Sequence, residues 1–118
     1  MHVVTKILSV LVALEFLYIF YLETIATTSA KTSEVFGMTT EELSRENLNV
    51  LFKNQGVYNG LLSVLILLAV FVFASKAALI CLLSYIVAVA LYGAFTSKPK
   101  IILMQGGLPI LTLISCIF

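Results

Sequence analysis

Two carboxyl groups lie within the first apolar run of the chain, where a lipid bilayer would be the surroundings. Glu15 lies near the middle of residues 3–27, and Glu23 follows eight residues later. On insertion scales, a charged side chain at mid-membrane costs about 3 kcal/mol. Acids at such positions commonly carry protons or bind cations. Glu15 and Glu23 are therefore the first candidates for proton or cation chemistry.

The apolar runs contain no basic side chain at a depth that would neutralise Glu15. Every Lys, Arg and His lies near the end of a run or between runs. Glu15 is then protonated, or held ionised by amide and phenol donors, or paired with a charge that a ligand brings. At about 100° per helical residue, Tyr18 flanks Glu15 and Glu23 lies on the same broad face. We expect this face to turn away from lipid.

Amide donors are concentrated in the stretch "NQGVYNG" at residues 54–60, just before a second apolar run. Gly56 and Gly60 form a GxxxG step, which lets another helix backbone approach closely. We expect the amides to donate to the carboxyl groups while the glycines admit the neighbouring helix. The polar side chains recur every four residues and form one ridge, with Gln55, Asn59 and Ser63 in one row and Asn54 and Tyr58 in the next.

The last two apolar runs add two candidates. Tyr92 lies near the end of the third run, and Gln105 lies about one turn inside the fourth. Pro109 cannot donate to the carbonyl of Gln105, so we expect a kink or a local opening there. The predicted ligand-binding residues are Glu15, Tyr18, Glu23, Asn54, Gln55, Tyr58, Asn59, Tyr92 and Gln105.

Structural interpretations compete with the functional ones. Glu15 could be a protonated strut between helices, although a functional role is favoured. Glu23 lies nearer the membrane boundary and could reach water, so a structural role is favoured there. The glycine step is expected to pack helices, and Gln105 fits helix-end capping as well as it fits a site.

The composition defines the class of protein. Of 118 residues, 61% are hydrophobic and 11% charged, whereas soluble domains are about 25% charged. A net charge of +1 without a basic cluster excludes nucleic-acid binding. Cys81 and Cys116 lie in apolar runs and are interpreted as packing residues, and His2 stands alone. The sequence predicts no metal site and no cofactor.

Four apolar runs are long enough to span a bilayer as helices, at residues 3–27, 57–74, 77–96 and 101–118. Only Ser75 and Lys76 separate the second from the third, and Lys98, Pro99 and Lys100 separate the third from the fourth. The first run is too long for a secretion signal and carries an acid at its centre. We therefore predict an all-α, antiparallel four-helix bundle forming one transmembrane domain over residues 1–118.

The segment between the first two runs predicts an interfacial helix over residues 40–53. Thr39 and Glu42 have the spacing of a capping box, and Leu43, Val50 and Leu51 would face the membrane surface. Basic residues then predict the orientation: five lie in loops 1–2 and 3–4, and two, Lys6 and Lys76, lie on the other side. This bias places both loops in the cytoplasm and both termini outside the plasma membrane.

Four stretches resemble one known family: "ALEFLYIFYLE" at 13–23, "NQGVYNG" at 54–60, "LYGAFT" at 91–96 and "KIILMQGG" at 100–107. They are similar to the domain of unknown function 1304 family, which consists of short, mostly bacterial membrane proteins with four spans. Many members carry His after the first Glu, where this chain has Phe16, so proton transfer through that His has no counterpart here. The residues matching the family pattern are Glu15, Tyr18, Leu22 and Glu23, then Asn54, Gln55, Gly56, Tyr58, Asn59 and Gly60, then Gln105, Gly106 and Pro109.

Three functions are compatible with these residues. The leading hypothesis is binding or transport of a small lipophilic or cationic ligand, coupled to a proton or cation exchanged at Glu15 and Glu23. A second is an intramembrane enzyme for a lipophilic substrate with Glu15 as general acid and base, although no second catalytic group stands out. A third is a structural or interaction protein. The expected surroundings are the lipid bilayer, and a homodimer is left open.

Overall fold

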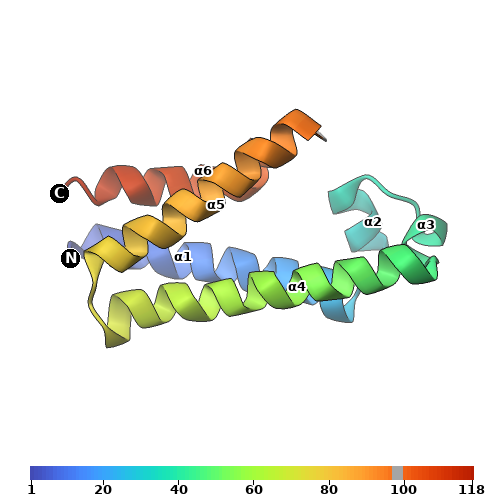
Figure 1. Cartoon of the computed structure of the whole chain (residues 1–118), viewed down its shortest axis with the longest axis horizontal. Coiled ribbons are helices and arrows are strands. Elements are labelled where there is room, and N and C mark those ends of the chain that lie inside the picture. Colours follow the sequence, from blue (N-terminus) through green and yellow to red (C-terminus); the bar gives the residue numbers. More distant parts are fainter. Residues whose placement is uncertain (97–99) are drawn as a thin grey trace. The chain divides into compact units, whose positions relative to one another are not determined.

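Helices make up all the regular secondary structure within residues 1–96 and 100–118, the part of the chain that this computed structural model describes (Figure 1). Two short segments are π-helical and extend longer α-helices. In chain order the elements are α1 (Val3–Phe20), η1 (Tyr21–Ile25), α2 (Ala30–Phe36), α3 (Thr40–Ser44), α4 (Glu46–Leu67), η2 (Leu68–Val72), α5 (Lys76–Thr96) and α6 (Lys100–Ser115).

Three of these helical stretches are long and apolar enough to cross a membrane: Val3–Ile25, Glu46–Val72 and Lys76–Thr96. They are compatible with a membrane location and agree with the composition. The apolar part of α6, Met104–Ser115, is shorter, and the α-helix continues through Pro109. The turn expected at Lys98 and Pro99 lies outside the described residues.

The second long helix begins earlier than its apolar run. It starts at Glu46, so the polar block at 54–60 lies inside the helix and not at its entrance. The single helix expected over residues 40–53 is instead α3 followed by the start of α4. Arg45 separates them with an extended backbone, φ −64° and ψ 132°. Leu43 is buried, whereas Val50 and Leu51 are exposed, so these three residues do not share one face.

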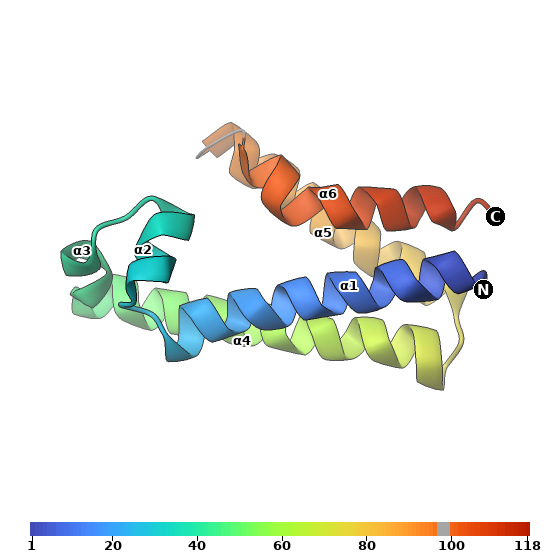
Figure 2. The same ribbon diagram turned by 180° about the vertical axis from the view of Figure 1, so that it is seen from behind.

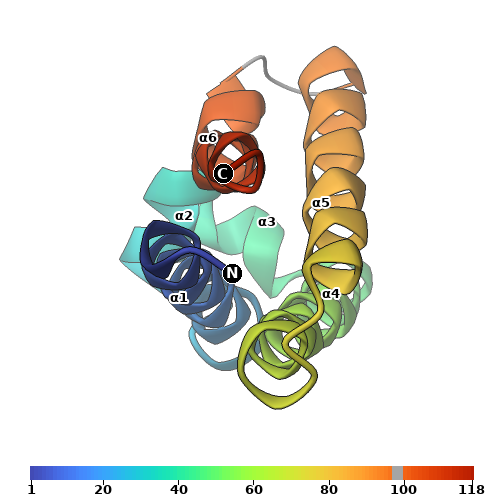
Figure 3. The ribbon, with the colours of Figure 1, turned by 90° about the vertical axis from the view of Figure 1, so that its left-hand side faces the viewer.

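The chain divides into two units, and each is described by itself. The first comprises Met1–Ala13 and Val64–Phe118, and in it α5 packs against α6. The buried residues of α5, Leu79, Leu83, Ile86 and Ala90, recur at helical spacing. The hydroxyl groups of Thr5 and Ser115 lie 2.8 Å apart and connect α1 to α6. Both chain termini and the start of α5 lie at one end of this unit (Figures 1 and 3).

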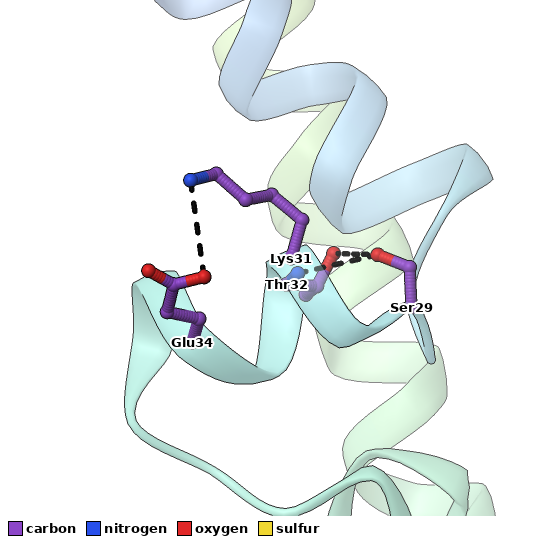
Figure 4. Close-up of polar contacts among 4 residues, drawn as sticks. All are labelled: Ser29, Lys31, Thr32 and Glu34. Atoms are coloured by element: carbon purple, nitrogen blue, oxygen red, sulfur yellow. Dashed lines mark hydrogen bonds and ion pairs between the residues drawn. The ribbon is translucent and has the colours of Figure 1, made fainter.

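The second unit, Leu14–Ser63, contains the end of α1, η1, the short helices α2 and α3, and the first part of α4. Ser29 caps α2 by accepting from the backbone N–H of Thr32 at 3.2 Å (Figure 4). The Thr32 hydroxyl lies 2.6 Å from the carbonyl oxygen of Ala26, which follows η1. Lys31 and Glu34 form an exposed ion pair on the same helix, 3.9 Å apart. The first turn of α2 is thus bonded to the end of the first long helix.

The predicted capping box of α3 is confirmed. The Thr39 hydroxyl accepts from the N–H of Glu42 at 3.0 Å, and the Glu42 carboxylate accepts from the N–H of Thr39 at 3.1 Å. Bonds from the backbone N–H and hydroxyl of Thr39 hold the pKa of Glu42 below its ordinary value. The Asn49 amide donates to the carbonyl of Leu43 at 3.1 Å, which links the end of α3 to α4.

A glycine seam, Gly56 and Gly60, lets α4 approach the first long helix closely within the second unit (Figure 2). A Cβ added at Gly56 would lie 1.9 Å from the Thr24 hydroxyl oxygen, and one added at Gly60 would lie 2.8 Å from a ring carbon of Phe20. Both distances are shorter than atoms tolerate. The expected close approach at the GxxxG step is therefore confirmed.

Replacing a glycine of the seam should destabilise the protein, because the added Cβ clashes with atoms of the first long helix. We expect Gly60→Ala to lower the free energy of unfolding in detergent by about 1–3 kcal/mol, because the Phe20 ring must move. Gly107→Ala is the matched control, since no atom lies within 4 Å of its added Cβ, and it should change stability by less than about 1 kcal/mol. Equal stability of Gly60→Ala and Gly107→Ala would contradict the close approach.

Candidate functional site

The centre of the candidate site is the carboxyl group of Glu23. This side chain is 0% exposed, and its Oε1 accepts a hydrogen bond from the Asn59 amide nitrogen at 2.6 Å. Glu23 belongs to the first long helix and Asn59 to α4, and both lie in the second unit. A carboxyl group and an amide from two potential membrane spans therefore meet in the interior of the unit.

Local backbone geometry fixes the position of Glu23. It lies in η1, where the helix widens and the N–H of Ala26 reaches the carbonyl of Tyr21 at 2.9 Å. Such π-helical turns occur frequently at functional sites. The Thr27 hydroxyl donates to the carbonyl of Glu23 at 2.7 Å, and the Thr24 hydroxyl donates to the carbonyl of Lys53 at 3.3 Å. The Thr27 bond stabilises the backbone at the end of η1, and the Thr24 bond attaches η1 to α4.

The glycine seam brings the two helices close enough for the short Asn59 side chain to reach the acid. A Cβ at Gly56 would lie 3.1 Å from the Cβ of Glu23, tighter than most real contacts. Any residue larger than glycine at 56 would therefore crowd Glu23 directly. The same seam that packs the helices also sets the geometry of the carboxyl–amide pair.

Each of the two acids of the first long helix has one buried oxygen that no hydrogen bond satisfies within the described residues, Oε2 of Glu15 and Oε2 of Glu23. The ion pair found in that part of the chain joins Lys31 and Glu34, so neither acid has a protein counter-charge there. An ionised carboxylate buried without a partner is strongly unfavourable. These oxygens are therefore suited to carry a proton or to bind a cation. No group of three His, Cys, Asp or Glu side chains that could hold a metal occurs in residues 1–96 and 100–118.

Of the predicted site residues, the structure brings Glu23 and Asn59 together. The expectation that Glu23 could reach water is wrong, because the side chain is fully buried. The expected donation from an amide of the 54–60 block to a carboxyl group of the first apolar run is found at Glu23, which accepts from Asn59. Glu15 is half-buried, and the other candidates of the second unit are on exposed faces: Tyr18 (48% exposed) and Tyr58 (76%), together with Asn54 and Gln55.

Tyr92 and Gln105 belong to the first unit. Tyr92 is 71% exposed on α5, and Gln105 is half-buried on α6. Their participation in one pocket with the carboxyl groups stays a prediction. Thr24 and Thr27 are not among the predicted site residues, yet their hydroxyl groups hold the backbone around Glu23. For Thr27 the sequence does contain a sign of this role. It follows Glu23 by four residues, the spacing at which a threonine hydroxyl reaches a helical carbonyl.

Comparison with known proteins places this chain in a family. The profile of the family described as "Protein of unknown function (DUF1304)" matches residues 10–117. The chain is 56% identical over 119 residues to the uncharacterized protein YpaA of Lactococcus lactis subsp. lactis (strain IL1403), with all of both chains covered. No solved structure matches it. The matched region includes Glu15, Glu23 and Asn59, and the chain belongs to the DUF1304 family of proteins of unknown function.

Proposed function

We propose that this protein binds a proton or a cation reversibly at Glu23, and that this exchange is coupled to the binding or transport of a small ligand. One observation carries the proposal. The Glu23 carboxyl is fully buried, with one oxygen bonded to Asn59 and the other without a partner in the described residues. A carboxyl group held in this way is oriented by the amide and keeps one oxygen for exchange.

Glu15 supplies a second carboxyl group on the same long helix, also with an unpartnered buried oxygen. Its carboxyl would receive or deliver the proton or cation at a different depth of the membrane. Two acids along one span form a minimal relay, the arrangement that proton-coupled membrane proteins use. The exposed Tyr18, Gln55 and Tyr58 would then contact the ligand or a second copy of the chain.

The proposed arrangement in the membrane is a single antiparallel bundle of four spans with α6 as the fourth, and α3 at the membrane surface. Its support is the apolar character of α6, Met104–Ser115, beside the three longer helices. The basic residues favour a plasma-membrane protein with loops 1–2 and 3–4 in the cytoplasm and the termini outside. A dimer of such bundles is the simplest way to enclose a path for a ligand.

A purely structural role is the second candidate, and the close packing at Gly56 and Gly60 favours it. In that case Asn59 and Glu23 would be a hydrogen-bonded strut that joins two spans. The two functions differ in what happens when the acid loses its ability to ionise. Glutamine at position 23 preserves the strut and removes the exchange.

Proton exchange can be measured in liposomes that contain the purified protein and an entrapped pH-sensitive dye. We expect an imposed gradient of Na⁺, K⁺ or tetraphenylphosphonium to drive proton movement in the natural protein. Glu23→Gln should abolish this signal, because the amide accepts from Asn59 but carries no exchangeable carboxyl proton. Glu15→Gln should also reduce it.

The matched control is Glu41→Gln, which changes an exposed acid in the first turn of α3 and should leave proton movement unchanged. Proton movement that is the same in the natural protein, Glu23→Gln and Glu15→Gln would contradict the proposed function. A stable Glu23→Gln variant with no other loss would then support the structural role.

The pair itself can be tested by a double-mutant cycle with Glu23→Leu and Asn59→Leu. We expect Asn59→Leu alone to lower the free energy of unfolding in detergent by about 1–2 kcal/mol, because it leaves both Glu23 oxygens without a partner. In a protein that already carries Glu23→Leu, Asn59→Leu should lower the free energy of unfolding by less than it does in the natural protein. The difference, the coupling energy of the pair, should be about 1 kcal/mol. The control is Asn54→Leu, which replaces an exposed amide one and a half turns earlier in α4. If Asn54→Leu lowered the free energy of unfolding as much as Asn59→Leu, the bond between Asn59 and Glu23 would not be the cause of the loss.

A further inference from the structure

The first unit has a groove between the start of α1 and the end of α6, with a volume of about 610 Å³. This volume lies within the range of small-molecule sites, roughly 300–1,000 Å³. Its walls are mainly apolar, with Val4 and Leu8 on the side of α1 and Leu111 and Ile114 on the side of α6. The helical stretch Val3–Ile25, which begins with α1, is long and apolar enough to span a bilayer, so in a membrane the groove would lie beside the hydrocarbon tails of lipids.

Two polar residues, His2 and Ser115, also line this groove. The Ser115 hydroxyl is occupied, since it donates to the carbonyl of Thr112 at 2.6 Å and lies 2.8 Å from the Thr5 hydroxyl. His2 is exposed, and its Nδ1 accepts from the N–H of Val4 at 3.0 Å. An imidazole that accepts at Nδ1 carries its proton at Nε2. His2 therefore offers one N–H donor beside an apolar groove.

The charged side chains of the first unit are all basic. All six acidic side chains of the chain lie between residues 15 and 46, so the first unit has none. Lys6 lies one turn after His2, and α5 begins with Lys76 at the same end of the unit as both chain termini (Figures 1 and 3). An amphiphile with an anionic head and an apolar tail matches both the charge and the walls.

We propose that the groove binds an anionic phospholipid, with one acyl chain between α1 and α6 and the phosphate beside His2. The tail contacts Val4, Leu8 and Ile114, and the Nε2–H of His2 donates to a phosphate oxygen. Lys6 and Lys76 favour the anionic head through their charge without direct contact being required. This site is separate from the Glu23 site and does not depend on the function proposed for it.

The test is native mass spectrometry of the full chain in detergent with added dioleoyl phosphatidylglycerol or dioleoyl phosphatidylcholine. We expect the protein to retain phosphatidylglycerol about fivefold more than phosphatidylcholine, the factor that corresponds to about 1 kcal/mol for a lysine near an anionic head. Ile114→Trp should fill the groove and lower phosphatidylglycerol retention several-fold. Ile110→Trp, on the same helix but outside the groove lining, should not.

The head-group preference is tested separately. Lys6→Gln combined with Lys76→Gln should equalise the two lipids, whereas Lys53→Gln in the second unit should leave the preference intact. His2→Ser keeps a residue that caps helices and should lower phosphatidylglycerol retention. Equal retention of both lipids by the unaltered protein would overturn the proposal, and this comparison needs no variant to fold. Unchanged phosphatidylglycerol retention in a helical Ile114→Trp protein would also overturn it.

Discussion

The hydrogen bond from the Asn59 amide to the Glu23 carboxyl is the constraint on which the second unit depends. A buried carboxyl group requires a donor, and asparagine has a short side chain, so the two helix backbones must lie close together. Gly56 and Gly60 provide this approach because neither carries a side chain toward Thr24 or Phe20. The Glu23 carboxyl, the Asn59 amide and the two glycines of "NQGVYNG" thus depend on one another, because the hydrogen bond forms only where the glycines let the helices lie close together.

The backbone around the acid is stabilised by hydroxyl groups. In a π-helical turn the carbonyls are less regularly satisfied than in an α-helix, and the hydroxyls of Thr27 and Thr32 bond to the carbonyls of Glu23, Leu22 and Ala26. Thr32 belongs to α2, so this short helix is bonded to the end of the first long helix. The connection between the first two long helices therefore helps to hold the site.

Much of the architecture follows from local sequence patterns. Apolar runs predict the first and third long helices closely, and spacing alone predicts the capping box at Thr39 and the packing role of Gly56. These features are local, and their physical rules involve residues a few positions apart. The presence of two acids in the first apolar run and of candidate amide donors is likewise readable from the sequence.

Local sequence patterns do not show that the buried acid bonded to Asn59 is Glu23 and not Glu15. Regular α-helical geometry gives each residue a fixed rotation, and the π-helical turn at η1 breaks that rule at the position of Glu23. Proximity to the end of the apolar run suggested water, but the folding of α2 and the approach of α4 exclude it. The break at Arg45 was also missed, because the Asn49 amide satisfies the carbonyl of Leu43 that a continuous helix would have used.

Infrared difference spectroscopy of the membrane-reconstituted protein examines the state of Glu23 directly. We expect a carbonyl band of a protonated carboxyl group that disappears in Glu23→Gln, shifts in Asn59→Leu, and is lost when pH or a bound cation removes the proton. A spectrum that contains no such band, or a band that neither substitution alters, would contradict the claim that the buried acid carries an exchangeable proton beside Asn59.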